Sequence, residues 1–99
     1  MLGHQRCGAV HAALDSRLHG TRHKSRIQIL VDSISPGLSA VDPQLSPEQQ
    51  LDRAIEQNVR WSIHQLLATP EGKAAVEEGR AHIVGAVYEI ASGLVRFLD

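Results

Sequence analysis

Residues 2–14 read LGHQRCGAVHAAL, and this stretch gives the first strong indication of the fold. Leu2 and Gly3 suit the end of a β-strand, whereas the alanines that follow favour a helix. Four apolar residues recur at helical spacing: Val10, Ala13, Leu14 and Leu18. Because residues at this spacing share one face of a helix, residues 8–18 are predicted to be helical, and Gly20 ends the helix. The stretch therefore predicts a strand that runs directly into a helix.

A second helix is predicted after Ser25, its expected N-cap, and the pair Pro36-Gly37 terminates it. Its apolar face consists of Ile27, Leu30, Val31 and Ile34. Residues 35–46 are predicted to form a loop.

The longest predicted helix has the clearest start signals. Ser46 is its expected N-cap, Pro47 suits the first helical position, and Gln49 stands at the capping-box distance from Ser46. An apolar stripe then follows the helix: Leu51, Ala54, Ile55, Val59, Ile63, Leu66 and Leu67. A fourth, short helix begins with the same cap-then-proline pattern at Thr69-Pro70, and Gly79 closes it.

The carboxy-terminal residues predict two strands joined by a turn. Residues 81–90 read AHIVGAVYEI, a nearly continuous apolar run that is typical of a strand covered on both faces. Ser92-Gly93 is a turn signal, and residues 94–98 are predicted to pair with the first strand in a hairpin. Because a strand buried on both faces needs neighbouring strands and flanking helices, we expect the sheet to be incomplete in this chain.

Composition limits the class of protein. The 99 residues suffice for one small domain, and ten Lys and Arg against eleven Asp and Glu give a net charge of −1. This balance lacks a concentrated positive field, so neither nucleic acid nor a membrane is expected as a partner. No segment approaches the ~20 apolar residues of a membrane span, and the amino terminus lacks a signal-peptide core. Cys7 is the only cysteine, so an intrachain disulfide is excluded and a cytoplasmic location is the expectation.

His4 and Cys7 are the candidate metal ligands. They are spaced His-x-x-Cys and lie just before and at the start of the first predicted helix. The positive end of a helix dipole favours a thiolate, which is the form of cysteine that binds zinc, and neutral imidazole is a compatible second ligand. Catalytic zinc usually has three protein ligands, so the bare pair is also compatible with a structural cysteine and a capping histidine.

The remaining histidines are His11, His19, His23, His64 and His82. His19 and His23 have an i, i+4 spacing, but Gly20 lies between them and interrupts a helix. We therefore interpret both as surface residues in polar turns. His64 and His82 are expected at solvated margins of the fold.

Several segments resemble the β-class carbonic anhydrases. Residues 2–14, with the order Gly-His-x-x-Cys-Gly at 3–8, resemble the family's second zinc-binding segment. The Asn58-Val59 pair resembles part of a later helix, and residues 76–93 resemble the closing helix, strand and turn. The similarity covers nearly the whole chain in the family's order. It implies an α/β fold with three to four helices and a carboxy-terminal strand hairpin from a mostly parallel sheet.

The resemblance also implies a chemistry. Members of the family hold Zn²⁺ with two cysteines and one histidine, and zinc lowers the pKa of bound water to about 7 for attack on carbon dioxide. By resemblance, His4 and Cys7 are two of these ligands. The third ligand and an Asp-Arg pair belong to an earlier Cys-x-Asp-Ser-Arg segment in the family. Asp15-Ser16-Arg17 repeats three of those letters without the cysteine, which we interpret as coincidence.

Two functional hypotheses follow from the resemblance. In the first, residues 1–99 form a single carbonic-anhydrase-like domain, truncated at its amino terminus and impaired in the reversible hydration of carbon dioxide to bicarbonate. Because family members pair as dimers, a homo-oligomer or association with a complementary chain is expected. In the alternative, the chain is a non-catalytic fragment that associates with another subunit through its open sheet edge.

Overall fold

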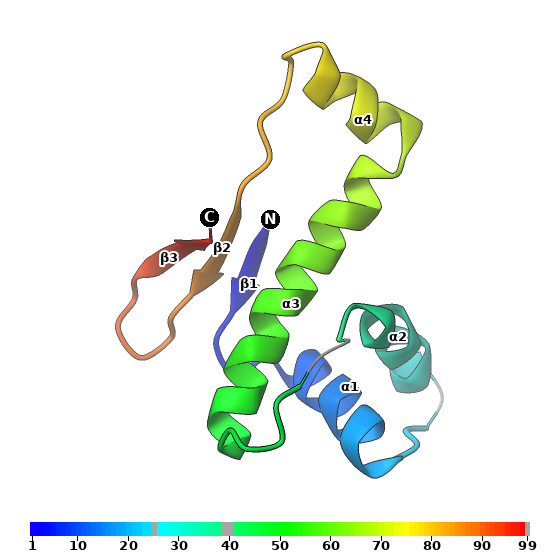
Figure 1. The fold of residues 1–99 in the computed structure, drawn as a ribbon, viewed down its shortest axis with the longest axis vertical. Coiled ribbons are helices and arrows are strands. Elements are labelled where there is room, and N and C mark those ends of the chain that lie inside the picture. The colour runs from blue at the N-terminus through cyan, green and yellow to red at the C-terminus, as the bar shows by residue number, and fades with distance from the viewer. Residues whose placement is uncertain (25, 39–40, 99) are drawn as a thin grey trace.

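The fold is described here from a computed structural model, which describes residues 1–24, 26–38 and 41–98 (Figure 1). The elements of these residues, in chain order, are β1 (Leu2–His4), α1 (Gly8–His19), α2 (Arg26–Ile34), the 3₁₀ turn η1 (Ser35–Gly37), α3 (Pro47–Leu67), α4 (Pro70–Glu77), β2 (Gly85–Tyr88) and β3 (Val95–Leu98). Apart from η1, the element types and their order agree with the sequence prediction, including the strand end at residues 2 and 3.

The three strands form one mixed sheet in the order β1-β2-β3. β1 and β2 are parallel, with Leu2 opposite Ala86, whereas β2 and β3 form the predicted antiparallel hairpin, with Tyr88 opposite Val95. β2 is shorter than the predicted strand over residues 81–90: its four residues all pair with β3, and three of them also pair with β1. Gly85, Ala86 and Val87 are all buried, as expected for a strand covered on both faces.

Helix α3 lies along β1 and β2, and α1 and α2 pack together beside it (Figure 1). The glycines of the sheet allow this close approach. A Cβ atom added at Gly3 would lie 2.7 Å from Val59 Cγ2, and one at Gly85 would lie 3.0 Å from Val59 Cγ1. The core between these elements consists of Val10, Ala13, Leu14, Val31, Ile34, Leu38, Ala54, Ile55, Val59 and Val87. The Val59 side chain of α3 therefore packs directly against the backbone of β1 and β2 at these two glycines.

The predicted inward face of α2 is partly wrong. Ile27 and Leu30 are 55% and 49% exposed, whereas Gln28 is buried at 8%. Burial of this amide is possible because both of its polar atoms are bonded: Oε1 accepts from the backbone N–H of His23 at 2.9 Å, and Nε2 donates to Asp32 Oδ1 at 2.8 Å. The predicted N-cap, Ser25, lies outside the described residues.

The loop predicted for residues 35–46 contains more structure than expected. Residues 35–37 form η1, and the side chain of Leu38 is fully buried in the core. Leu38 contributes to the same cluster as Val31 and Ile34 of α2, so this connection is anchored by apolar burial.

The starts of α3 and α4 are as predicted. Ser46 Oγ accepts from the Gln49 N–H at 3.2 Å, and Gln49 Oε1 accepts from the Ser46 N–H at 3.1 Å, which completes the capping box. The apolar stripe of α3 is buried only in part, because the last turns of the helix extend beyond the short sheet and leave Leu66 and Leu67 exposed (Figure 1). Within the described ranges, no helix has both the length and the apolar character needed to cross a membrane.

Candidate metal centre

The two candidate ligands flank a tight connection between β1 and α1. His4 is the last residue of β1, and the backbone N–H of Gln5 donates to the carbonyl of Tyr88 at 2.8 Å. Cys7 is the N-cap residue of α1, and its carbonyl accepts from the N–H of His11 at 2.9 Å. The imidazole therefore comes from the carboxyl end of a strand, and the thiol comes from the amino end of a helix.

The His4 ring is exposed, and one of its nitrogens is already bonded. Nδ1 lies 3.1 Å from the carbonyl oxygen of Gln5. Because a carbonyl only accepts hydrogen bonds, this contact requires the hydrogen on Nδ1. The neutral ring then has its lone pair on Nε2, which is the state in which imidazole binds a metal.

The Cys7 thiol is half-buried at the start of α1. Its side chain makes no capping hydrogen bond, so the sulfur is not used to close the helix. Imidazole and thiolate are both ligands that zinc prefers, so the donor types fit this metal.

The described residues do not supply a complete ligand set. Across ranges 1–24, 26–38 and 41–98, no three His, Cys, Asp or Glu side chains gather closely enough to hold a metal ion. The assignment of His4 and Cys7 as ligands therefore stays a prediction. It places two of the metal's ligands in this turn.

Between the ligands, Arg6 has a left-handed backbone conformation with φ of 59°. A residue with a Cβ atom is strained in this region by about 1–2 kcal/mol, whereas glycine is not. The conformation lets the chain change direction between the strand and the helix within three residues, 5–7. The turn that separates His4 from Cys7 thus depends on a strained residue.

We expect the free energy of unfolding of Arg6→Gly to lie no more than about 1 kcal/mol below that of the original chain, or to exceed it. The reason is that glycine adopts this conformation freely. Arg6→Val is expected to lower the free energy of unfolding by about 1–2 kcal/mol, because a β-branched residue resists positive φ. Urea unfolding of the two variants checks both values. Equal stability of Arg6→Gly and Arg6→Val would contradict the strained turn.

Of the other histidines, His11 lies close to this turn: its backbone N–H donates to the Cys7 carbonyl, and it lines a pocket together with Gln5 and Arg6. His19, His64 and His82 are exposed as predicted, and His64 stacks on Trp61 with a centroid distance of 5.6 Å. The surface prediction for His23 is wrong. Its ring is half-buried with Nε2 at 3.1 Å from the Ala12 carbonyl, so it joins the segment before α2 to α1.

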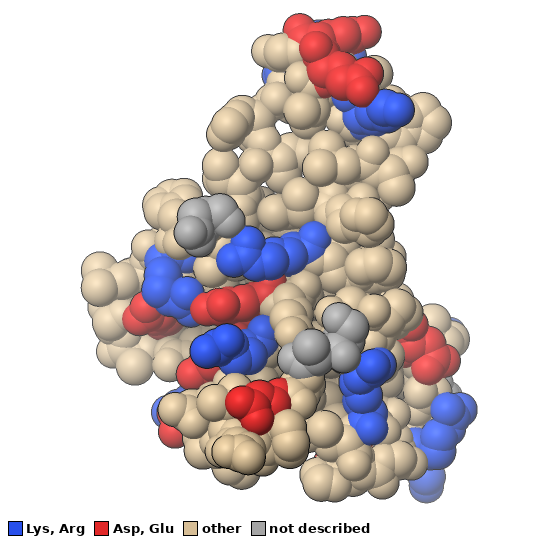
Figure 2. Space-filling model, viewed as in Figure 1, with Lys and Arg blue, Asp and Glu red and all other residues tan. Residues whose placement is uncertain are grey.

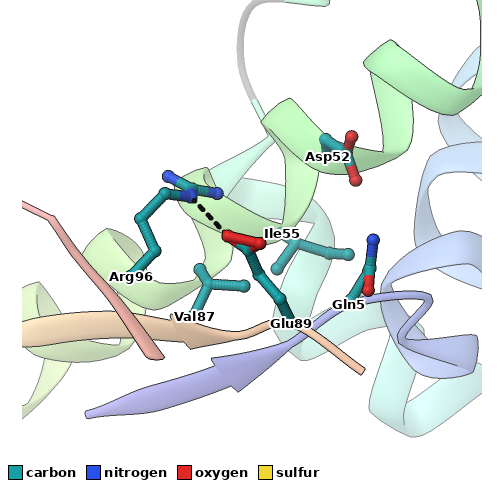
Figure 3. Close-up of a pocket in the computed structure, with 6 residues that line it drawn as sticks. All are labelled: Gln5, Asp52, Ile55, Val87, Glu89 and Arg96. Carbon is teal, nitrogen blue, oxygen red and sulfur yellow. Dashed lines mark ion pairs between the residues drawn. The ribbon is translucent and has the colours of Figure 1, made fainter. Parts of the chain in front are cut away.

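A pocket of about 190 Å³ lies beside the turn. It is lined by Gln5, Asp52, Ile55, Val87, Glu89 and Arg96 (Figure 3). Arg96 is paired with Glu56 at 2.7 Å and with Glu89 at 3.6 Å, which links β3 to α3 and to the end of β2. Basic and acidic side chains are interspersed on this face of the molecule (Figure 2). Sequence reasoning did not identify Gln5 as part of this region.

Comparison with known proteins identifies the family. The family model described as carbonic anhydrase matches residues 1–95. This chain belongs to the carbonic anhydrase family. The resemblance stated from the sequence is therefore confirmed. No curated protein matches this carbonic anhydrase chain.

Solved β-carbonic anhydrases have the same fold. The β-carbonic anhydrase CcaA matches with a TM-score of 0.78 at 19% identity, over 99% of this chain and 45% of that chain. One of two tetrameric β-carbonic anhydrases from Sordaria macrospora matches at 0.76 and 20% identity, over 98% and 49%. A Coccomyxa β-carbonic anhydrase in complex with acetazolamide matches at 0.71 and 24% identity, over 98% and 44%.

These matches confirm the predicted α/β class, with four helices and a carboxy-terminal hairpin among the described residues. The carbonic anhydrase chain spans about half the length of the solved structures that it matches.

Proposed function

We propose that this chain takes part in the zinc-dependent, reversible hydration of carbon dioxide to bicarbonate, with His4 and Cys7 as two of the zinc ligands. The supporting observation is the β1–α1 turn of a carbonic anhydrase family member, where an exposed imidazole, with Nδ1 at 3.1 Å from the Gln5 carbonyl oxygen, and a thiol at a helix start lie three residues apart. When bound, zinc supplies the activation of water for attack on carbon dioxide at neutral pH.

The chain's own residues prepare the two donors. The Gln5 carbonyl lies 3.1 Å from His4 Nδ1, which suits a ring that presents Nε2 to a metal, and the Cys7 side chain makes no capping bond at the start of α1. The parallel pairing of β1 with β2 fixes the strand that ends in His4. Because two ligands hold zinc more weakly than three, hydration by the 99 residues alone is expected to be low.

Assembly with further chains is part of this proposal. Large apolar side chains of the sheet and of its hairpin turn are exposed: Leu2, Ile90, Leu94, Val95 and Phe97. Burial of such side chains stabilises an interface, and relatives of the same fold from Sordaria macrospora are tetrameric. We therefore expect a homo-oligomer or a complex with a complementary carbonic anhydrase chain.

Zinc content per chain and the rate of carbon dioxide hydration, measured together on the purified protein, test this function. We expect partial zinc occupancy that rises with added zinc, and a low hydration rate that rises in parallel. His4→Ala is expected to lower both by about 100-fold, because one of two ligands is lost. His82→Ala is the matched control, since His82 is an exposed histidine outside this turn. A rate that persists after chelation of zinc would contradict the proposal.

The second candidate function is that of a non-catalytic fragment that pairs with another subunit. The observation in its favour is the position of β3 at an edge of the described sheet, with Phe97 70% exposed. This candidate predicts that the zinc-free chain co-purifies with a full-length relative and that Phe97→Lys abolishes the association. Zinc binding by the isolated chain favours the first candidate.

A further inference from the structure

Gln5 connects the candidate ligand His4 to the distant hairpin. Its carbonyl oxygen accepts from His4 Nδ1 at 3.1 Å, and its side-chain Oε1 accepts from the backbone N–H of Ala91 at 3.1 Å. Its own backbone N–H donates to the Tyr88 carbonyl at 2.8 Å. Ala91 belongs to the turn between β2 and β3, 86 residues away in the chain. One residue therefore joins the ligand, the end of β2 and the hairpin turn.

The surroundings of Gln5 favour an ordered side chain. The residue is half-buried and lines the pocket that also contains Glu89 and Arg96 (Figure 3). The hairpin turn that it contacts is itself closed by two backbone bonds of 2.8 Å, from the Glu89 N–H to the Leu94 carbonyl and from the Gly93 N–H to the Glu89 carbonyl. The backbone N–H of Ala91, which donates to Gln5 Oε1, is thus held in place by the other hydrogen bonds of the hairpin turn.

The neighbouring residue shows why the turn needs this contact. Arg6 is held at a φ of 59°, so the segment between the ligands is strained. Strained backbone persists only where surrounding contacts determine its conformation. The bonds of Gln5 to Tyr88 and Ala91 are such contacts on the His4 side of the turn.

We propose that Gln5 is a positioning residue of the metal centre. Its side-chain bond to Ala91 fixes the place of its carbonyl, and this carbonyl keeps the hydrogen on His4 Nδ1, so that Nε2 is the atom presented to a metal. The inference rests on the proposed function, because it takes His4 as a ligand. Partners of this kind orient the ring of a metal-binding histidine and raise its basicity, and their loss costs about 10–100-fold in metal affinity.

Two substitutions and one control separate this function from a general effect on stability. Gln5→Leu keeps a side chain of similar size and removes the acceptor for the Ala91 N–H. Gln5→Glu keeps an acceptor at the same reach and is the conservative rescue. Gln65→Leu, at an exposed glutamine of α3, is the control for an added apolar side chain.

The experiment uses the metal-free chain at a pH where His4 is neutral, followed by Co²⁺ titration as the metal probe. Nitrogen chemical shifts of the His4 ring report which nitrogen has the hydrogen, and amide hydrogen exchange reports the Ala91 bond. In Gln5→Leu we expect a shift of the hydrogen towards Nε2, Ala91 exchange about tenfold faster, and Co²⁺ binding about tenfold weaker. Gln5→Glu is expected to restore the Ala91 bond and the Nδ1 hydrogen, and Gln65→Leu to change none of the three.

Specific results would overturn the inference. A wild-type His4 with its hydrogen on Nε2 contradicts it without any variant, so the test does not depend on Gln5→Leu folding. An unchanged His4 tautomer and unchanged Co²⁺ affinity in Gln5→Leu refute the positioning by Gln5 and leave the proposed function intact. If the wild type does not bind Co²⁺ while Gln5→Leu shows the expected tautomer change, the proposed function is refuted instead.

Discussion

Cys7→Ser is expected to abolish metal binding and to leave the fold intact. A serine hydroxyl does not ionise at neutral pH, so the variant loses the thiolate and retains His4 as the one donor from this turn. We expect the affinity for Co²⁺ or Zn²⁺ to fall by at least about 100-fold, and carbon dioxide hydration to fall to the uncatalysed rate. Titration calorimetry with Co²⁺ measures the affinity of both proteins, and the thiolate-to-cobalt absorption band identifies sulfur as a donor in the wild type.

Stability provides the control for Cys7→Ser. Cys7 is the N-cap residue of α1 and makes no capping bond through its side chain, whereas serine is a preferred N-cap. The free energy of unfolding of the metal-free variant is therefore expected to equal that of the wild type or to exceed it by up to about 1 kcal/mol. Unchanged metal affinity in a folded Cys7→Ser protein would refute the assignment of Cys7 as a ligand.

Gly3→Ala is expected to be the most destabilising of the small substitutions near the site. The added Cβ atom would lie 2.7 Å from Val59 Cγ2 and 3.5 Å from Ile55 Cγ2, where both side chains are buried. A short β-branched side chain in a filled core has little freedom to move away, so we expect a loss of about 1–3 kcal/mol in urea unfolding. Because Gly3 immediately precedes His4, the same displacement is expected to weaken Co²⁺ binding.

A double substitution tests whether this contact is the cause. Val59→Ala alone is expected to cost about 2 kcal/mol through the space that it leaves. In Gly3→Ala/Val59→Ala, the new methyl group occupies the space of the lost one, so the combined cost is expected to be at least about 1 kcal/mol less than the sum. Gly8→Ala is the matched control, since a Cβ atom there meets nothing within 4 Å. If the losses in unfolding free energy of Gly3→Ala and Val59→Ala simply add, the contact between residues 3 and 59 is not the cause.

Features that depend on a few neighbouring residues could be predicted from the sequence. The capping box of Ser46 and Gln49 was predictable because donor and acceptor lie within one helical turn. The end of α1 at Gly20 was predictable for the same reason, and the glycine has the expected left-handed conformation with φ of 67°.

Features that depend on distant partners could not be predicted in this way. The inward face of α2 includes Gln28, whose burial depends on bonds to His23 and Asp32 that periodicity does not reveal. The extent of β2 depends on its pairing with β1 and β3, which the apolar run over residues 81–90 does not reveal.

The candidate site shows the same division. His4 and Cys7 were identified because their spacing and their place before a helix are visible in the sequence. Gln5 was missed, because its side chain bonds to a backbone amide 86 residues away. No pattern of residue types indicates such a bond, since any backbone N–H can be the donor.

The parallel pairing of β1 with β2 has a consequence for synthesis. The Met1 amine donates to the carbonyl of Val84 at 2.8 Å, so the first strand obtains its partner from the other end of the chain. During translation, the segment that ends in His4 leaves the ribosome before its partner strand and cannot pair until residues 86–88 have also emerged. Contacts of such long sequence separation form slowly, because a large loop must close before they are made. Residues 2–4 can thus reach their native place only after residues 86–88 have been made.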